Sequence, residues 1–312
     1  MEASTFLLKT ADEVDLFVYR WLTAQPPRAI VQIVHGLAEH AGRYGRLAQA
    51  LNAAGYAVYA NDLRGHGRTV KSAEELGFFA EQDGWRKCID DLWLVNRHIA
   101  SAHPGVPIIM LGHSMGSTLA EQFMGDHGDS LAGVVLSGAN GKPTGMAVIG
   151  RQITRAERLR LGARGKSKLA LSLSFDAFNK KFAPTRTAFD WLSRDPVEVD
   201  KYVADPLCGF APSIQLWVDL LDGWGAVSRE EHRRRVPRTL PIYVIAGGRD
   251  PVSGNARQVG PWVEEYRADG HKDLEFRIYP EARHELMNET NRDEVTRDLV
   301  AWLDRVVGGV SR

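Results

Sequence analysis

The sequence is poor in cysteine and carries no excess charge of either sign. Only Cys88 and Cys208 occur among its 312 residues, which excludes a disulfide framework and favours a reducing compartment. Its 39 Lys and Arg residues balance 39 Asp and Glu residues. Because no global positive field is present to attract phosphate backbones, we expect no nucleic acid as a partner.

Long apolar runs and a signal peptide are also missing. No stretch approaches the 18 consecutive apolar residues that a membrane-spanning helix needs. The first residues, MEASTFLLKTADEVD, include acidic side chains and lack the basic and apolar regions of a secretory signal. These absences predict a cytoplasmic protein, and the sequence sets no oligomeric state.

Short apolar runs alternate with longer helical patterns along much of the chain. The runs with strand character are 5–10, 14–22, 29–34, 56–61, 107–111, 131–137, 241–246 and 273–279. Helical patterns occupy 42–54, 83–103, 115–126, 255–268 and 292–306. The first two strands read as an antiparallel hairpin. The rest of the alternation predicts an α/β fold, with a mostly parallel eight-stranded sheet flanked by helices.

The alternation stops after Gly138 and resumes at Pro241. The segment between them has helical but no strand character. We therefore expect a core domain made of residues 1–139 and 239–312, with a helical cap inserted at 140–238. The cap should lie over the carboxyl edge of the sheet, where open α/β sheets bind their ligands.

A candidate nucleophile lies in the pentapeptide Gly112-His113-Ser114-Met115-Gly116, which matches G-x-S-x-G. The apolar run PIIML precedes it, and the helix-forming run STLAEQFM (117–124) follows it. This strand–turn–helix context is the one that a nucleophile elbow requires. The pattern therefore predicts that Ser114 attacks a carbonyl carbon.

A serine hydroxyl needs a base that accepts its proton, and the base needs an acid that orients it. His284 follows the last predicted strand, and Asp250 follows the strand PIYVIA. Pro251 disfavours helix at the preceding position, which suits a carboxylate on a loop. The chain order Ser114, Asp250, His284 is that of α/β-hydrolases.

Other residues compete for these two roles. His35 and His40 lie near the loop after the strand AIVQIV, and either could replace His284 as the base. Asp219 and Asp222 are alternative acids, although they fall inside the predicted cap. Asp250 itself could instead open a turn or cap a helix.

The loop His35–His40 should supply one backbone N–H to a tetrahedral oxyanion, and the residue after the nucleophile should supply the other. We assign these donors to the amides of Leu37 and Met115. No cluster with zinc-like spacing is visible, so we expect neither a metal nor an organic cofactor.

The sequence resembles the monoacylglycerol lipase and bacterial lysophospholipase group of the α/β-hydrolases. The similarity extends over nearly the whole chain. It is carried by HGLAEHAGRY (35–44), DLRGHGRT (62–69), GHSMGS (112–117), GGRDPVS (247–253) and YPEARHE (279–285).

The resemblance implies the triad Ser114, Asp250 and His284, with the amides of Leu37 and Met115 as the oxyanion hole. It also implies hydrolysis of single-chain acyl esters, of the monoacylglycerol or lysophospholipid type, through a covalent acyl-enzyme. The segment Asp62–Gly67 has no evident chemistry, and we interpret it as a structural turn.

The predicted cap contains a basic segment, 151–168, with an interleaved apolar stripe that includes Ile149, Ile153 and Leu159. The favoured interpretation packs this stripe on the core. The alternative is a basic amphipathic helix that makes transient contact with a membrane surface. The predicted cap also holds eight aromatics, Phe175, Phe178, Phe182, Phe189, Trp191, Phe210, Trp217 and Trp224. We expect most of them to pack in the core, and some could line a tunnel for an acyl chain.

Other functions remain compatible with the same elbow. They include a general carboxylesterase, an aminopeptidase-like amide or thioester hydrolase, and a non-catalytic receptor on the same fold. An epoxide hydrolase would carry an aspartate where Ser114 stands. The leading hypothesis is an enzyme that hydrolyses a small-molecule acyl ester.

Overall fold

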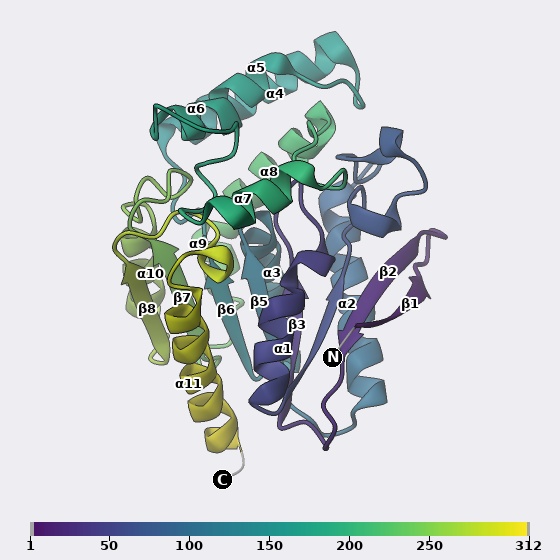
Figure 1. Ribbon diagram of the computed structural model, residues 1–312, viewed down its shortest axis with the longest axis vertical. Coiled ribbons are helices and arrows are strands. Elements are labelled where there is room, and N and C mark those ends of the chain that lie inside the picture. Colours follow the sequence, from purple (N-terminus) through teal and green to yellow (C-terminus); the bar gives the residue numbers. More distant parts are fainter. Residues whose placement is uncertain (1–2, 311–312) are drawn as a thin grey trace.

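A computed structural model describes residues 3–310 and contains one eight-stranded sheet (Figure 1). Its strands stand in the order β1-β2-β4-β3-β5-β6-β7-β8. Their bounds are β1 Ser4–Lys9, β2 Asp15–Trp21, β3 Ala29–Val34, β4 Tyr56–Asn61, β5 Ile108–His113, β6 Gly133–Ser137, β7 Ile242–Gly247 and β8 Leu274–Tyr279. The predicted number of strands is confirmed.

The amino-terminal hairpin is confirmed as well. Strands β1 and β2 pair antiparallel, with Ser4 opposite Arg20 and Lys9 opposite Asp15. Strand β2 also pairs antiparallel with β4, and the remaining neighbours pair parallel. The carboxyl ends of β3 to β8 therefore meet at one edge of the sheet.

Helices cover both faces of the sheet, so the inner strands are buried and mostly apolar. Along β3, Ile30 packs in the cluster on one face while Val31 and Ile33 pack in the cluster on the other, as the two-residue period of a strand requires. Helices α1 and α11 cover the second face, and α2, α3 and α10 cover the first (Figure 1). These helices are α1 Gly45–Ala53, α2 Gly84–Ala102, α3 Met115–His127, α10 Val259–Ala268 and α11 Arg292–Val310.

Two predicted helices begin later than expected. The pattern at 42–54 starts as a 3₁₀ turn, η1 Ala41–Tyr44, before α1. Helix α10 begins at Val259 rather than near 255, because Asn255 and Ala256 have positive φ and the preceding residues form turns. Short 3₁₀ turns elsewhere are η2 Gly67–Thr69, η3 Ala73–Glu75, η4 Gly128–Ser130 and η5 Leu286–Asn288.

The segment between β6 and β7 is helical and lies over the carboxyl edge of the sheet (Figure 1). Its helices are α4 Gly145–Leu161, α5 Lys168–Leu173, α6 Phe175–Lys180, α7 Pro196–Ala204, α8 Ile214–Val227 and α9 Glu230–Arg233. We call residues 140–238 the cap, and the division into two domains stays a prediction. Within residues 3–310, no helix has both the length and the apolarity to cross a bilayer.

Candidate active site

Ser114 occupies a sharp turn between β5 and α3, as the motif predicts. Its φ of 54° and ψ of −120° are unfavourable for a residue with a side chain. Several hydrogen bonds hold the turn. The Ser114 amide donates to the Ser137 carbonyl at 2.9 Å, and the Ser117 hydroxyl donates to the Ser114 carbonyl at 2.6 Å.

The two glycines of the pentapeptide allow the backbone segments to approach closely. A Cβ at Gly112 would collide with the backbone of Gly116, and a Cβ at Gly116 would collide with the carbonyls of Val34 and His35. The turn therefore lies directly against the end of β3. This contact explains why the motif needs glycine at both positions.

His284 and Asp250 meet at the same edge of the sheet. Nδ1 of His284 lies 3.0 Å from Oδ2 of Asp250, and the two side chains are 2% and 0% exposed. The other Asp250 oxygen accepts from the Val252 amide at 2.9 Å. Since a carboxylate only accepts, Nδ1 carries the proton and Nε2 is left free to accept one.

The surroundings of His284 favour its protonated form. Burial by itself lowers the pKa of the imidazole, but the charge and hydrogen bond of Asp250 outweigh burial and raise that pKa above 6.5. The rings of Trp191 and His113 lie beside it, with centroids 5.1 Å and 4.8 Å away. Burial lowers the pKa of His113, which keeps this second imidazole neutral.

One cavity of about 350 Å³ brings the predicted residues together. Ser114, His284, Leu37 and Met115 all line it, while Asp250 lies behind His284. The Ser114 hydroxyl makes no hydrogen bond to another residue of the described chain. Hydrogen bonds between a serine and its base are often long in the absence of substrate and tighten only when substrate is bound.

The predicted oxyanion donors are unoccupied by the rest of the chain. Within residues 3–310, the amides of Leu37 and Met115 donate to no other residue, and Met115 is the first residue of α3. The loop carrying Leu37 approaches the serine so closely that a Cβ on Gly36 would lie 3.2 Å from Ser114 Cβ. An anion held there would also meet the positive end of the α3 dipole.

The two competing bases, His35 and His40, bind other groups and do not reach the cavity. Burial lowers the pKa of His35 to about 3, and its Nε2 accepts from the Leu63 amide at 2.9 Å. His40 contacts Asp205 at 2.9 Å. Neither imidazole lines the cavity.

The competing acids also lie apart from any imidazole. Asp219 accepts from Gln215, and Asp222 binds Arg151 and Arg155. The structure therefore pairs only Asp250 with the predicted base.

The segment Asp62–Gly67 is structural, as predicted. Arg64 binds Asp91 and Asp12 through both ends of its guanidinium, at 2.5 to 2.8 Å. Asp62 accepts from the amides of Ala41 and Arg68. These bonds tie the hairpin, α2 and the loop after β4 to one another.

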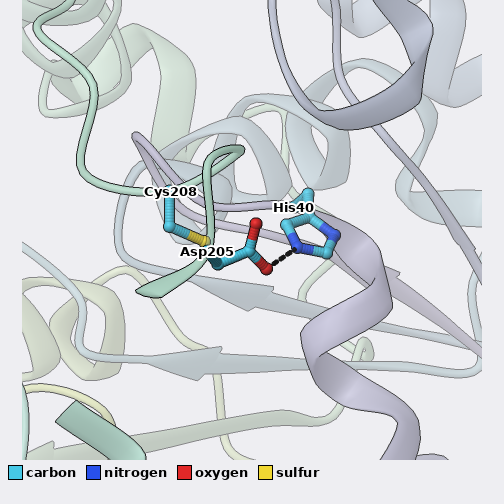
Figure 2. A group of neighbouring side chains, drawn as sticks. All are labelled: His40, Asp205 and Cys208. Atoms are coloured by element: carbon cyan, nitrogen blue, oxygen red, sulfur yellow. Dashed lines mark hydrogen bonds and ion pairs between the residues drawn. The ribbon is translucent and has the colours of Figure 1, made fainter. Parts of the chain in front are cut away.

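Three side chains with metal-binding chemistry, His40, Asp205 and Cys208, gather where the cap meets the loop after β3 (Figure 2). Nδ1 of His40 accepts from the Gly42 amide at 3.2 Å, so Nε2 holds the proton and donates to Asp205. Burial raises the pKa of the Cys208 thiol, which disfavours a thiolate ligand. The trio fits a hydrogen-bonded tether between the cap and the loop better than a metal site.

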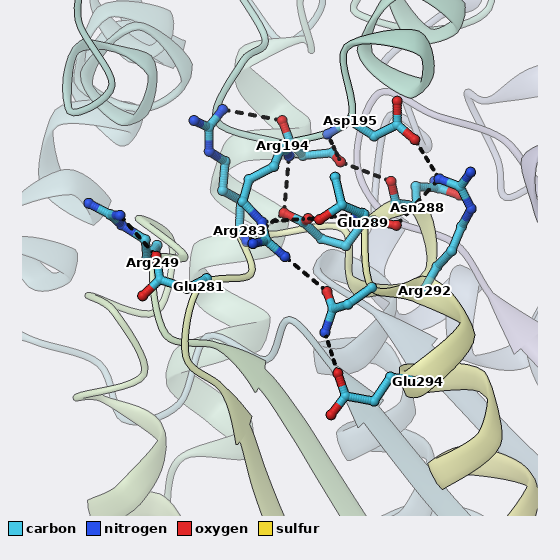
Figure 3. Close-up of polar contacts among 12 residues, drawn as sticks. Arg194, Asp195, Arg249, Glu281, Arg283, Asn288, Glu289, Arg292 and Glu294 are labelled. Carbon is cyan, nitrogen blue, oxygen red and sulfur yellow. Dashed lines mark hydrogen bonds and ion pairs between the residues drawn. The ribbon is translucent and has the colours of Figure 1, made fainter.

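Sequence reasoning missed the ion pairs that hold the His284 loop to the cap (Figure 3). Buried Glu289 accepts from the Arg283 amide at 2.8 Å and from the Arg194 guanidinium at 2.9 Å. Arg292 binds Asp195 at 2.6 Å. A second missed group, Glu39, Arg43 and Glu285, lies nearer the cavity. In the sequence, the only indication of this group was that all three residues lie within the motifs 35–44 and 279–285.

The cap supplies most of the apolar wall of the cavity. Five of the eight predicted aromatics line it, and they are Phe175, Phe178, Trp191, Trp217 and Trp224. Phe182, Phe189 and Phe210 do not line it. Among the described residues of the wall, none is Lys or Arg. The cavity therefore suits an apolar chain and offers no cation to a charged head group.

The favoured interpretation of the basic segment is wrong for part of its apolar stripe. Ile149 and Ile153 line the cavity, but Leu159 is 86% exposed. Helix α4 instead turns Arg151 and Arg155 toward α8, where both bind Asp222. The ion pairs decide which side of α4 faces the protein.

Comparison with known families matches residues 25–291 to the family described as serine aminopeptidase, S33. This stretch covers most of the chain. The chain belongs to the serine aminopeptidase S33 family. Its relatives include enzymes named for ester substrates, and the predicted resemblance to the monoacylglycerol lipase group is confirmed.

Two relatives and one solved structure illustrate this family. Monoacylglycerol lipase of Mycolicibacterium smegmatis is 30% identical over 287 residues, which cover 91% of this chain and 90% of that protein. Human monoglyceride lipase is 28% identical and covers 96% of this chain and 89% of its own length. A thermostable carboxyl esterase from Bacillus coagulans has a TM-score of 0.90 at 26% identity, covering 98% of this chain and 99% of that one.

The names of these relatives refer to ester hydrolysis, which is a reaction that a nucleophilic serine on this fold can perform. The α/β-hydrolase fold is confirmed, and the chain is a serine ester hydrolase. The amide-hydrolysing alternative is not favoured, although the name of the family refers to a peptidase.

Proposed function

We propose that Ser114, His284 and Asp250 form the catalytic triad of this ester hydrolase. Ser114 Oγ attacks the ester carbonyl while His284 Nε2 accepts its proton. Asp250 holds the imidazole in the required tautomer and stabilises the imidazolium. The alcohol then leaves with that proton, and water activated by His284 hydrolyses the acyl-enzyme.

The amides of Leu37 and Met115 are proposed to bind the oxyanion of both tetrahedral intermediates. Each such donor typically lowers the barrier by about 2.7–4 kcal/mol. Free amides on a preformed loop and at a helix N-terminus need no rearrangement to receive the charge. This geometry supports acyl transfer rather than a receptor role.

The proposed substrate is an ester of one fatty acyl chain with an uncharged alcohol, such as a monoacylglycerol. The apolar wall, with five aromatics and no Lys or Arg, carries this proposal. Each methylene removed from water contributes about 0.8 kcal/mol. A lysophospholipid would bring a phosphate to a wall without a cation, and this cost favours the glyceride.

We also propose that the cap touches a membrane surface while substrate enters. Met146 on α4 and Leu173 on α5 line the cavity, yet they are 68% and 50% exposed. Apolar side chains at the cavity entrance suit a lipid surface. Because Arg151 and Arg155 are bound to Asp222, apolar contact should contribute more than charge. The two free cysteines, Cys88 and Cys208, support a cytoplasmic location.

The test compares wild type with Ser114→Ala on a short p-nitrophenyl ester. Loss of the nucleophile should lower kcat to the background rate, by up to about 10⁶-fold. Ser137→Ala is the matched control, because its buried hydroxyl has no partner within residues 3–310 and its carbonyl is retained. Equal turnover by Ser114→Ala would disprove the nucleophile.

A substrate series tests the rest of the proposal. A mono-oleoylglycerol should give a higher kcat/KM than lysophosphatidylcholine of the same chain, and a peptide anilide should be a poor substrate. A preference for the phospholipid would contradict the argument from the cavity wall. A preference for the anilide would contradict ester hydrolysis.

A further inference from the structure

Arg43 makes two buried ion pairs that join two loops of the proposed site. Its guanidinium contacts Glu39 at 2.7 Å and Glu285 at 2.6 Å and 2.7 Å. The three side chains are 10%, 4% and 6% exposed. Glu39 and Glu285 are 246 positions apart in the sequence, so only the folded chain brings them together.

On one side, this group fixes the loop that carries the Leu37 amide. Oε1 of Glu39 accepts from the Gly36 amide at 2.6 Å and from the Tyr44 hydroxyl at 3.0 Å. Gly36 is the residue directly before Leu37. The carboxylate of Glu39 therefore holds the backbone at the point where the proposed oxyanion hole begins.

On the other side, the group fixes the loop that carries His284. Glu285 is the next residue, and its carboxylate also accepts from Asn288 Nδ2 at 3.0 Å. Its amide donates to the Leu192 carbonyl of the cap at 2.8 Å. Arg43 therefore fixes the loop that carries His284 through Glu285, whose side chain and backbone both make hydrogen bonds.

The cap closes this group off from water. The Tyr202 ring of α7 lies against the guanidinium, with Arg43 Cζ 4.8 Å from its centroid. The Tyr202 hydroxyl donates to the Ala38 carbonyl at 2.8 Å, within the same loop as Leu37. Burial makes each charge expensive to leave unpaired, so the three groups stay together.

We propose that Arg43 is a positioning residue: by binding Glu39 and Glu285 at once, it fixes the distance between the oxyanion donors and the His284 imidazole. The inference rests on the function proposed above. The planar guanidinium can bind two carboxylates in a fixed geometry, and an ammonium cannot reproduce that geometry. A displacement of about 1 Å between catalytic groups can cost about 10²-fold in rate.

The first test is Arg43→Lys, which keeps the charge and loses the two-sided contact. We expect kcat to fall by about tenfold or more while KM changes by less than about twofold. Arg64→Lys is the matched control. Arg64 is also buried and also joins two carboxylates, but its partners Asp12 and Asp91 do not line the cavity. The partners of Arg43, Glu39 and Glu285, both line it. The Arg64 variant should lose a comparable amount of thermal stability and keep kcat.

The second test is Glu285→Gln, which keeps the shape and removes one charge. Titratable and charged groups near the His284 ring come from several segments, and they are Asp250, His113, Glu39, Glu285 and, beyond the carboxylates, Arg43. From the cap, the uncharged Trp191 ring lies beside the imidazole. Loss of the Glu285 charge should move the acid limb of the kcat/KM profile to lower pH, whereas Arg43→Lys should leave the limb in place.

The outcomes separate this proposal from the proposed function. If Ser114→Ala is inactive but Arg43→Lys keeps kcat within about twofold of wild type, the positioning role is overturned and the triad stands. A matching loss of kcat in Arg64→Lys would also overturn it, because the effect would then be general destabilisation. Should Arg43→Lys fail to fold, an unchanged acid limb and kcat in Glu285→Gln would count against the proposal.

Discussion

The carboxyl edge of the sheet and the cap enclose the same cavity under different constraints. At the edge, Gly112, Gly116 and Gly247 stand where any Cβ would collide with the backbone of a neighbouring segment. The cap instead offers a set of apolar side chains, such as Phe178 and Leu221, that share one property. The comparison teaches that the chemistry depends on exact positions, while substrate preference depends on the volume and polarity of a wall.

After removal of the nucleophile itself, the largest effect should come from the edge, with Asp250→Asn. The amide can no longer hold the imidazole tautomer, so kcat should fall by about 10⁴-fold. Steady-state kinetics on a soluble ester measures this loss. Asp219→Asn is the matched control, because Asp219 is a partly buried cap carboxylate that contacts Gln215 and no histidine. A comparable loss in the control would break the distinction between edge and cap.

A smaller effect concerns pH and sharpens the role of His284. The imidazole must be neutral to accept a proton, and its pKa is raised by Asp250. As pH falls through that raised pKa, the protonated fraction grows, and kcat/KM should fall by about tenfold per pH unit. The midpoint should lie above 6.5. A flat profile between about pH 5 and 8 would contradict this role.

The smallest effect belongs to the cap, in the pair Met146→Ser with Leu173→Ser. Less apolar surface at the cavity entrance should weaken binding to phosphatidylcholine vesicles by about three- to tenfold. Turnover of a short p-nitrophenyl ester, whose acyl group needs little of the cavity wall, should fall by less than vesicle binding. Val203→Ser is the control, since Val203 is an exposed apolar residue of α7 that does not line the cavity. Vesicle sedimentation at two salt concentrations would show whether apolar contact or charge is responsible.

Equal weakening by the control would place the contact elsewhere on the surface. A strong dependence on salt would contradict the proposal that apolar contact contributes more than charge.

The sequence predicts the sheet and the proposed triad because both rest on local patterns. Each strand is a short run rich in apolar and β-forming residues, and Ser114, Asp250 and His284 each follow one of them. Parallel strands bring their carboxyl ends together, so residues after strands converge without any knowledge of distant contacts. The late start of α10 escaped prediction because the positive φ of Asn255 and Ala256 depends on how the turn is packed.

Contacts between distant loops were beyond such reasoning. Arg43 and Glu285 are separated by 242 positions, and an ion pair across that distance leaves no periodic trace. The prediction of which side of α4 faces the protein failed for a related reason. Its apolar and basic residues predict an amphipathic helix, but only Asp222 of α8 decides which side turns inward.

The positions of the proposed triad along the chain bear on its biosynthesis. Ser114 and its turn precede α3, whereas His284 lies 170 positions later, between β8 and α11. A ribosome adds residues from the amino terminus, so the nucleophile is synthesised well before its base. Esterase turnover should therefore appear only when the carboxyl-terminal strand and helix have docked, which makes activity a direct reporter of completed folding.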